Sequence, residues 1–351
     1  MRRALALGLP AVWGATAITY KWVCPLAQRD GLGTRIAGSA VFFAVGTGLM
    51  LRVRQVMLRE VRQAREVAGA AQSVLLRPLP VRIDGLAVAA AQLSADRGAS
   101  VGGDLYEVIA TEHGVRVVMG DVRGHGLAAI GTVAAVLGSF REAVHDEAEL
   151  AGVLARLDRA LARHLRDRAR AEDTEDFVTV LLLEIAPDGE LHALNCGHPW
   201  PYLLSGGRAE LLAGADPMPP LGAFPLPVEP PVTPCGQLLP GEALFLHTDG
   251  VEDARDPQGR FFPLAGALAE AVRGRPVSPQ SVLRAVFTQL LRHTAGRPKD
   301  DIAILVLRND RFISRAPVFR GAGLPESAAP PRGATSHDAP AADTPPVAPA
   351  P

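Results

Sequence analysis

Apolar residues near the N-terminus gather in two runs that contain no charged side chain. The runs cover residues 4–20 and 36–51, and each is about the shortest length that crosses the hydrocarbon core of a bilayer. Together they predict a membrane hairpin of two transmembrane helices over residues 1–51. The first run also fits a cleaved signal peptide, because Arg2 and Arg3 precede it and an Ala-Thr-Ala sequence lies near its end.

Arginines around these runs predict which way the hairpin faces. Lysine and arginine gather on the cytoplasmic side of membrane helices. Arg2 and Arg3 precede the first run, and five arginines follow the second run between residues 52 and 65. We therefore expect a multi-pass protein of the cell membrane, with its N-terminus and the part of the chain after the second run in the cytoplasm.

Residues 52–80 form a predicted linker. Its small and apolar side chains are spaced alternately four and three apart, which is typical of a coiled-coil seam of roughly three heptads. The spacing predicts one helix over residues 52–76, ended by prolines, and a possible homodimer through residues 53–76. The alternative is a single amphipathic helix packed on its own domain, because alanine makes a weak seam. The seam positions are Met57, Val61, Ala64, Ala68, Ala71 and Leu75.

After residue 80 the sequence alternates between strand and helix patterns. Runs rich in β-branched and apolar residues predict strands, and longer mixtures of apolar and charged residues predict helices. The order of strands, two helices, strands, two helices and a strand predicts an α+β domain over residues 81–310, with stacked sheets and helices outside. The predicted strands are 86–93, 105–110, 115–119, 177–185, 190–196, 201–204, 243–247 and 302–307, and the predicted helices are 127–145, 150–168, 264–273 and 281–293.

Proline marks two further segments. Its density in residues 211–241 excludes a central strand there, because proline cannot donate a hydrogen bond to a sheet. Residues 311–351 are rich in proline, alanine and glycine and poor in aromatic residues. This composition predicts a disordered tail.

Composition narrows the classes of function. The 351 residues are 48% hydrophobic and 21% charged, enough for one globular core with extensions. The net charge is -1 and the arginines form no basic face with interleaved aromatic residues, so we expect no nucleic acid partner. Cys24, Cys196 and Cys235 are odd in number and far apart, which argues against a disulfide framework and for a reducing compartment.

Aspartates stand at the ends of four predicted strands. Asp104 and Asp121 lie at the open end of a predicted β-hairpin, Asp249 follows the strand at 243–247, and the pair Asp300-Asp301 precedes the last strand. An Asp-Gly pair taken alone is typical of a turn. Several carboxylates that converge at one sheet edge suit Mg²⁺ or Mn²⁺, which prefer oxygen ligands. Four such sites together predict a metal centre.

Five short motifs occur in the order found in one enzyme family. They resemble the bacterial metal-dependent serine/threonine phosphatases of the stage II sporulation protein E type, relatives of protein phosphatase 2C. The resemblance covers residues 81–308, and residues 75–80 resemble a segment common in actinobacterial members, often downstream of membrane helices. The motifs are GGDLY at 102–106, GDVRGHG at 120–126, NCGHP at 195–199, HTDGVE at 247–252 and DDIA at 300–303.

The resemblance implies a fold and a reaction. The fold is the four-layer α-β-β-α sandwich of the PPM phosphatases, with two Mn²⁺ or Mg²⁺ ions held between the sheets. Such ions activate water for attack on a phosphate ester, so no serine or cysteine nucleophile is required. The implied substrate is phosphoserine or phosphothreonine on an anti-sigma-factor antagonist, and the implied outcome is regulation of sigma-factor-dependent transcription.

The resemblance also implies the metal ligands. Asp121 would bridge the two ions, with the carbonyl group of Val122 beside it. Asp104 and Asp249 would bind directly or through water, and these three aspartates are the expected catalytic residues. Asp300 would complete the ligand set.

Two acidic positions leave alternatives. Asp300 is the first acidic residue of its motif, and Asp301 is its rival, because neighbouring side chains on a strand point to opposite faces. Many family members carry an aspartate where this chain has Glu107. We expect the longer Glu107 side chain to reach a metal ion through water at most.

Three further polar residues depart from the family pattern or have two interpretations. Arg123 stands where eukaryotic relatives carry a histidine proposed as general acid, and it either binds the substrate phosphate by its charge or is an exposed loop residue. His198 is either an acid or base, or part of a structural turn. Cys196 replaces the usual alanine, and we expect a small buried residue.

Two other functions fit parts of the sequence. The Gly-Gly-Asp at 102–104 superficially resembles the loop of diguanylate cyclases, but Leu105 stands where a cyclase requires an acidic residue, and Asp249 and Asp300 stay unexplained. A phosphatase fold kept as a partner-binding module is the stronger alternative. The presence of all four expected aspartates favours the enzyme.

Overall fold

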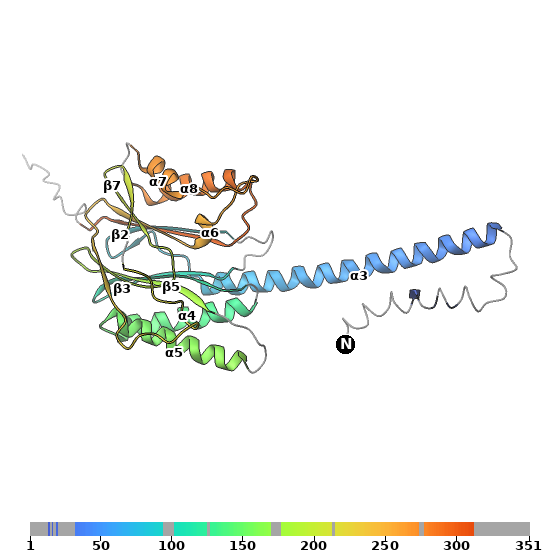
Figure 1. The fold of residues 1–351 in the computed structure, drawn as a ribbon, viewed down its shortest axis with the longest axis horizontal. Helices are drawn as coiled ribbons and strands as arrows, with labels where there is room; N and C mark the ends of the chain where they lie inside the picture. Colours follow the sequence, from blue (N-terminus) through green and yellow to red (C-terminus); the bar gives the residue numbers. More distant parts are fainter. Residues whose placement is uncertain are drawn as a thin grey trace, which may run out of the picture. The chain divides into compact units, whose positions relative to one another are not determined.

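Two antiparallel β-sheets pack face to face at the centre of the fold (Figure 1). We describe them from a computed structural model, and the described residues are 13, 14, 16, 19, 32–93, 102–124, 127–169, 177–212, 215–273 and 277–311, with the backbone alone at 32–39, 61, 62, 64–74, 127 and 169. The chain divides into two units, Met1–Ser314 and Arg315–Pro351. The second unit, which holds most of the predicted tail, lies outside the described residues.

Each sheet draws strands from distant parts of the chain. Sheet A has the order β1-β2-β11-β10-β7-β8, and sheet B has the order β3-β4-β5-β6-β9. The helices are α3 (Leu32–Leu75), α4 (Leu127–Asp146), α5 (Leu150–Ala169), α6 (Asp249–Glu252), α7 (Leu264–Val272) and α8 (Pro279–His293). The strands are β1 (Arg82–Ile83), β2 (Leu86–Leu93), β3 (Asp104–Thr111), β4 (Gly114–Val122), β5 (Val178–Ile185), β6 (Glu190–Cys196), β7 (Tyr202–Ser205), β8 (Arg208–Leu211), β9 (Thr233–Gln237), β10 (Ala243–His247) and β11 (Ile302–Asn309).

Three hydrophobic clusters define the layers. One joins α4 and α5 to the outer face of sheet B, one fills the space between the sheets, and one joins α7 and α8 to the outer face of sheet A. The strands alternate between these clusters, as the pleat requires: Val117 and Met119 of β4 face sheet A, and Val118 faces the helices. The predicted order of helix, sheet, sheet and helix layers is therefore present, and it brings the strand ends of both sheets to one edge.

Strand β4 carries a buried arginine that fixes the end of α4. The side chain of Arg116 has no exposed surface, and Nε donates to Glu184 on β5 at 2.7 Å. The same guanidinium donates to the carbonyl oxygens of Val144 at 3.1 Å, Glu147 at 2.5 Å and Ala148 at 2.5 Å. These carbonyls lie at the end of α4 and in the turn to α5, where backbone acceptors lack partners within the helix. Arg116 therefore joins the helix layer to sheet B.

The proline-rich segment contains a short strand that the sequence pattern did not predict. Strand β9 includes Pro234 and pairs with β6 at the edge of sheet B. Proline is compatible with an edge strand, which leaves one side of its backbone unpaired. The prediction that excluded a central strand is confirmed, while β1, β8, β9 and the short helix α6 were not predicted.

Helix α3 runs without a break from the second apolar run through the predicted linker. In the part of the chain that the structure describes, one stretch is long and apolar enough to cross a membrane, Ala40–Glu60, and Phe43 within it is 78% exposed. The first apolar run is described only at four residues, among them Trp13, whose ring centroid lies 5.2 Å from that of Phe42. The transmembrane hairpin is therefore not confirmed. Most side chains of the predicted dimer seam lie outside the described residues.

The end of α3 contacts the two-sheet domain through Arg141 of α4. Its Nη2 atom donates to the carbonyl oxygen of Leu75 at 2.7 Å, and its Nε donates to Glu107 of β3 at 2.8 Å. Leu76 packs against the cluster formed by α4, α5 and sheet B. One guanidinium thus joins the linker helix, α4 and sheet B.

We predict that Arg116→Met lowers the stability of the folded domain by about 2–4 kcal/mol, because buried carbonyl groups and Glu184 lose their donor. Thermal and urea unfolding of the full-length chain measure this. The matched control is Arg208→Met, which removes an exposed strand arginine and should change stability by less than about 0.5 kcal/mol. Equal effects of the two substitutions would contradict the role assigned to Arg116.

Candidate functional site

Five aspartates meet where the ends of the two sheets lie together. Asp104 begins β3 and stands directly opposite Asp121 of β4 in the antiparallel register. Asp249 begins α6, with Thr248 between it and the end of β10, and Asp300 and Asp301 precede β11. Charge coupling connects them, since Asp249, Asp300 and Asp301 all raise the pKa of Asp121. The structure therefore brings together the aspartates that the sequence placed at four strand ends.

Glycines allow the two halves of the site to approach each other. A Cβ atom at Gly103 would lie 2.3 Å from the carbonyl oxygen of Val122 and 2.7 Å from Oδ1 of Asp121. A Cβ atom at Gly250 would lie 1.9 Å from the carbonyl oxygen of Asp301. Real Cβ atoms do not come so close to oxygen. The glycines beside Asp104 and Asp249 are thus required by close backbone contact.

Thr248 connects the buried Asp104 to the opposite sheet. Its hydroxyl donates to Oδ2 of Asp104 at 3.2 Å and accepts from the backbone N–H of Ala303 at 2.9 Å. Asp104 is only 1% exposed, and within the described residues its Oδ1 atom has no hydrogen-bond partner. Sequence reasoning assigned no role to Thr248, because its partners lie 144 and 55 positions away.

Asp300 and Asp301 both face the cluster. Oδ2 of Asp301 accepts from the backbone N–H of Gly103 at 3.2 Å, and Oδ1 of Asp300 accepts from the backbone N–H of Asp301 at 2.9 Å. The strand begins only at Ile302, so the alternation of a pleated strand does not separate these two side chains. Asp301 is coupled to Asp104, and Asp300 to Asp249.

Burial and mutual repulsion make this cluster electrostatically costly. Burial, followed by the charge of Asp121, raises the pKa of Asp104 well above its usual range. Burial, followed by the charges of Asp249, Asp300 and Asp301, raises the pKa of Asp121 to about 7. Burial and the charge of Asp300 also raise the pKa of Asp249. A divalent cation between these groups would relieve the repulsion, because an opposite charge favours the ionised carboxylate.

The residues present fit Mg²⁺ or Mn²⁺. All the side chains involved supply oxygen, and the unpartnered Oδ1 of Asp104 is a buried acceptor with no donor of its own. Within the described ranges, no three His, Cys, Asp or Glu side chains surround one point closely enough to hold an ion alone.

Val122 and Arg123 follow Asp121 at the edge of this cluster. The backbone N–H of Val122 donates to the carbonyl oxygen of Gly103 at 3.1 Å, and its own carbonyl oxygen lies beside Gly103. Arg123 is exposed, its backbone N–H donates to the carbonyl oxygen of Phe177 at 2.9 Å, and its guanidinium carbon lies 5.1 Å from the Phe177 ring centroid. Arg123 therefore stands at the rim with its charged group in reach of solvent.

Glu107 lies away from the aspartate cluster. It is three residues after Asp104 on β3, so the pleat turns it to the opposite face, toward α4. There its carboxylate lies 2.7 Å from Nη2 of Arg141. Glu107 therefore supports the packing of α4 on sheet B.

Two other residues considered from the sequence are buried and unsuited to acid–base or nucleophilic chemistry. Burial lowers the pKa of His198 to about 3, so the ring is neutral at physiological pH. The side chain of Asn195 holds the backbone of His198 by two hydrogen bonds of 2.8 Å, which is the structural turn. Burial raises the pKa of the Cys196 thiol to about 12, so it is no nucleophile.

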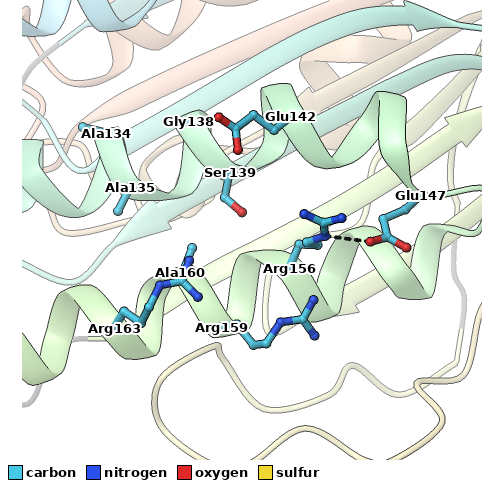
Figure 2. A pocket seen from close by; sticks show the side chains of 10 residues that line it. All are labelled: Ala134, Ala135, Gly138, Ser139, Glu142, Glu147, Arg156, Arg159, Ala160 and Arg163. Carbon is cyan, nitrogen blue, oxygen red and sulfur yellow. Dashed lines mark hydrogen bonds and ion pairs between the residues drawn. The ribbon is translucent and has the colours of Figure 1, made fainter.

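A groove of about 610 Å³ lies apart from the aspartates, between α4 and α5 (Figure 2). Small residues of α4, among them Ala135 and Gly138, face arginines of α5 across it. One of these arginines, Arg156, is paired with Glu147 at 2.7 Å. The groove holds charges of both signs, and none of the five aspartates lines it.

The raised pKa values predict how stability depends on pH in the absence of metal. The folded chain holds protons on Asp104, Asp121 and Asp249 that the unfolded chain releases above about pH 4. Their contribution to stability therefore decreases as pH rises, and for Asp121 this loss is complete above about pH 7.

We expect the melting temperature in chelator to fall between about pH 5 and pH 8, and to fall less in Asp121→Asn, which has no carboxyl group to titrate. Thermal unfolding at each pH measures both slopes. Identical slopes for the two proteins would show that Asp121 has an ordinary pKa.

Known structures share this fold. The SiaA-PP2C domain of Pseudomonas aeruginosa is 21% identical over 72% of this chain and 98% of that chain, with a TM-score of 0.56. The RsbU and RsbW domains of a Mycobacterium tuberculosis protein are 24% identical over 64% of this chain and 61% of that chain, with a TM-score of 0.50. The PP2C phosphatase domain of SpoIIE from Bacillus subtilis, with a fragment of its regulatory domain, is 16% identical over 64% of this chain and 63% of that chain, with a TM-score of 0.50.

The sequence also matches a family model, that of stage II sporulation protein E, over residues 111–310. This region includes Asp121, Asp249, Asp300 and Asp301, and it confirms the resemblance recognised from the motifs. Since the match covers more than half of the 351 residues, the chain belongs to the stage II sporulation protein E (SpoIIE) family.

Proposed function

We propose that this chain is a metal-dependent protein phosphatase that hydrolyses phosphoserine or phosphothreonine. The observation that carries the proposal is the cluster of five aspartates, in which the buried Asp104 keeps an unpartnered oxygen. Such a set of oxygens suits two Mg²⁺ or Mn²⁺ ions, which supply an activated water and neutralise charge on the phosphate. The SpoIIE family match and the PP2C-like fold support a phosphatase in general.

Three of the aspartates have proposed tasks in holding the ions. Asp121 stands between the two halves of the site, opposite Asp104 and coupled to Asp249, so it is the carboxylate that would bridge two ions. The Val122 carbonyl oxygen lies beside it at the same edge. Asp249 and Asp300 would hold an ion from the sheet A side, directly or through water, since each raises the pKa of Asp121.

Arg123 is the proposed contact to the substrate. Its position directly after the Asp121-Val122 pair places a permanent positive charge at the exposed rim of the site. Arginine binds phosphate oxygens by charge-assisted hydrogen bonds. In the overall reaction a water oxygen forms the new bond to phosphorus, the ester bond to the serine or threonine oxygen breaks, and that oxygen takes a proton.

The proposed substrate is a phosphorylated anti-sigma-factor antagonist, and the proposed outcome is control of sigma-factor-dependent transcription. Membership of the SpoIIE family supports this choice, and so does the fold shared with a chain that contains RsbU and RsbW domains. The apolar stretch Ala40–Glu60 supports attachment to the cell membrane. A multi-pass anchor with a cytoplasmic catalytic domain, and a homodimer formed through residues 53–76, belong to the same proposal.

The alternative is a phosphatase fold that binds partners and turns over weakly. It would require the metal centre to have lost a ligand or its geometry. Against it stands the complete set of aspartates, together with the supporting hydroxyl of Thr248. A measurement of phosphate ester hydrolysis distinguishes the two functions, because only the enzyme turns over its substrate efficiently.

We expect the full-length chain, kept in mild detergent, to hydrolyse p-nitrophenyl phosphate and a phosphoserine peptide with Mn²⁺ and to stop in chelator. Asp121→Asn should lower the rate at least about 100-fold, because both ions lose a shared ligand. Asp188→Asn, an exposed aspartate in the turn between β5 and β6 at the other end of sheet B, is the matched control and should retain the rate. Metal binding without turnover in the wild-type protein would favour the binding module.

We expect Asp300 and Asp301 to have different roles, metal binding for Asp300 and a structural contact with Gly103 for Asp301. We expect Asp300→Asn to weaken Mn²⁺ binding about tenfold or more without lowering stability in chelator, because among the described residues its carboxylate accepts only from the backbone of Asp301, and its charge repels Asp121 and Asp249. In chelator, Asp301→Asn should melt at a lower temperature than Asp300→Asn, because both substitutions remove a repelling charge and only Asp301→Asn also weakens the link to Gly103. Calorimetric Mn²⁺ titration and thermal unfolding test both. Stronger loss of Mn²⁺ affinity in Asp301→Asn would exchange the assignments.

A further inference from the structure

Asp121 is held from its second neighbouring strand by a threonine hydroxyl. Thr179 of β5 is its register partner, opposite to the side on which Asp104 pairs with it. The backbone N–H of Asp121 donates to Oγ1 of Thr179 at 3.3 Å. The side chain of Thr179 therefore fixes the backbone from which the Asp121 carboxylate extends.

The same hydroxyl contacts a buried histidine. Oγ1 of Thr179 lies 3.1 Å from Nδ1 of His198 and 3.5 Å from the carbonyl oxygen of Asp121. A hydroxyl has one hydrogen to donate, and the nearer acceptor is the ring nitrogen. Since burial keeps His198 neutral by lowering its pKa to about 3, Nδ1 can accept that hydrogen while Nε2 carries the ring proton.

His198 itself is fixed against both sheets. Asn195, at the end of β6 in sheet B, clamps its backbone through the two hydrogen bonds of 2.8 Å. On the other side the ring lies close to His247 of sheet A. The charge of His247 lowers the pKa of His198, and a hydrogen bond with the His247 backbone raises it. Within the described residues, Nε2 has no hydrogen bond of normal geometry. The ring thus fills the space between Thr179 and the strand that leads to Asp249.

His247 connects this arrangement to α6. Its Nε2 atom lies 3.2 Å from Oε1 of Glu252, and one residue, Thr248, separates it from Asp249 on the chain. The order from one sheet to the other is therefore Asp121, Thr179, His198 and His247. Its two ends are the backbones that carry Asp121 and Asp249.

We propose that Thr179 and His198 are a positioning pair, which sets where the Asp121 carboxylate stands relative to Asp249. Neither residue is one of the proposed metal ligands or the proposed contact to the phosphate. The inference rests on the proposed two-metal function, since the separation of these two carboxylates matters only if they share ions. Groups that orient metal ligands typically change metal affinity 10–100-fold when they are removed.

The test compares Thr179→Val, which removes the hydroxyl and keeps the branched shape, with Thr179→Ser, which keeps the hydroxyl. Calorimetric Mn²⁺ titration of the full-length chain should show about tenfold weaker binding for Thr179→Val, and binding within about threefold of wild type for Thr179→Ser. Thr294→Val is the matched control, because Thr294 is a buried hydroxyl that bonds only within and beside α8. It should lower the melting temperature without changing Mn²⁺ affinity.

Wild-type Mn²⁺ affinity in Thr179→Val would overturn the positioning pair. If that variant does not fold, His198→Leu and His198→Asn decide the same question, because asparagine keeps an acceptor near the position of Nδ1. Equal affinity of these two variants and wild type would also overturn it. Failure of the wild-type chain to bind Mn²⁺ would overturn both this inference and the proposed function, whereas wild-type binding with an unaffected Thr179→Val overturns the inference alone.

Discussion

The direct pairing of Asp104 with Asp121 across β3 and β4 is the constraint on which the rest of the site depends. Like charges opposite each other on neighbouring strands destabilise a sheet, and burial increases the cost. The structure holds them there with contacts from the opposite sheet, through the hydroxyl of Thr248 and the carboxylate of Asp301. A rigid scaffold thus keeps acidic groups in a place that they would leave if the chain were free to relax.

The scaffold is rigid because buried polar side chains join layers that apolar packing alone would allow to slide. Arg116 joins β4 to the end of α4, and Arg141 joins α4 to β3 and to the end of α3. Hydrophobic contact is non-directional, whereas these hydrogen bonds specify both position and orientation. The layers that carry the aspartates are therefore fixed in register as well as in distance.

Much of the fold and most of the site were predictable from the sequence, because both follow from local patterns. The apolar and β-branched runs predicted the strands of the two sheets, and the aspartates at the strand ends predicted the cluster. The roles of Thr248 and Thr179 were not predictable, because their partners lie far away in sequence. The prediction that Asp300 and Asp301 point to opposite faces of a strand rested on a wrong premise. Strand β11 begins at Ile302, one residue after Asp301, so neither aspartate is part of it. The pattern at Pro234 excluded a central strand but could not reveal that β9 is an edge strand.

The hairpin between β3 and β4 holds its two strands in one register. Its turn is two residues long, Glu112 and His113, and Gly114 closes it with a positive φ angle under the carbonyl oxygen of Ile185. A slip of one residue between these two strands would turn the side chains of the shifted strand to the opposite face. Asp104 would then point toward α4 instead of toward Asp121. The surface turn, seven pairs away from the carboxylates, therefore helps to fix the register that places Asp104 opposite Asp121.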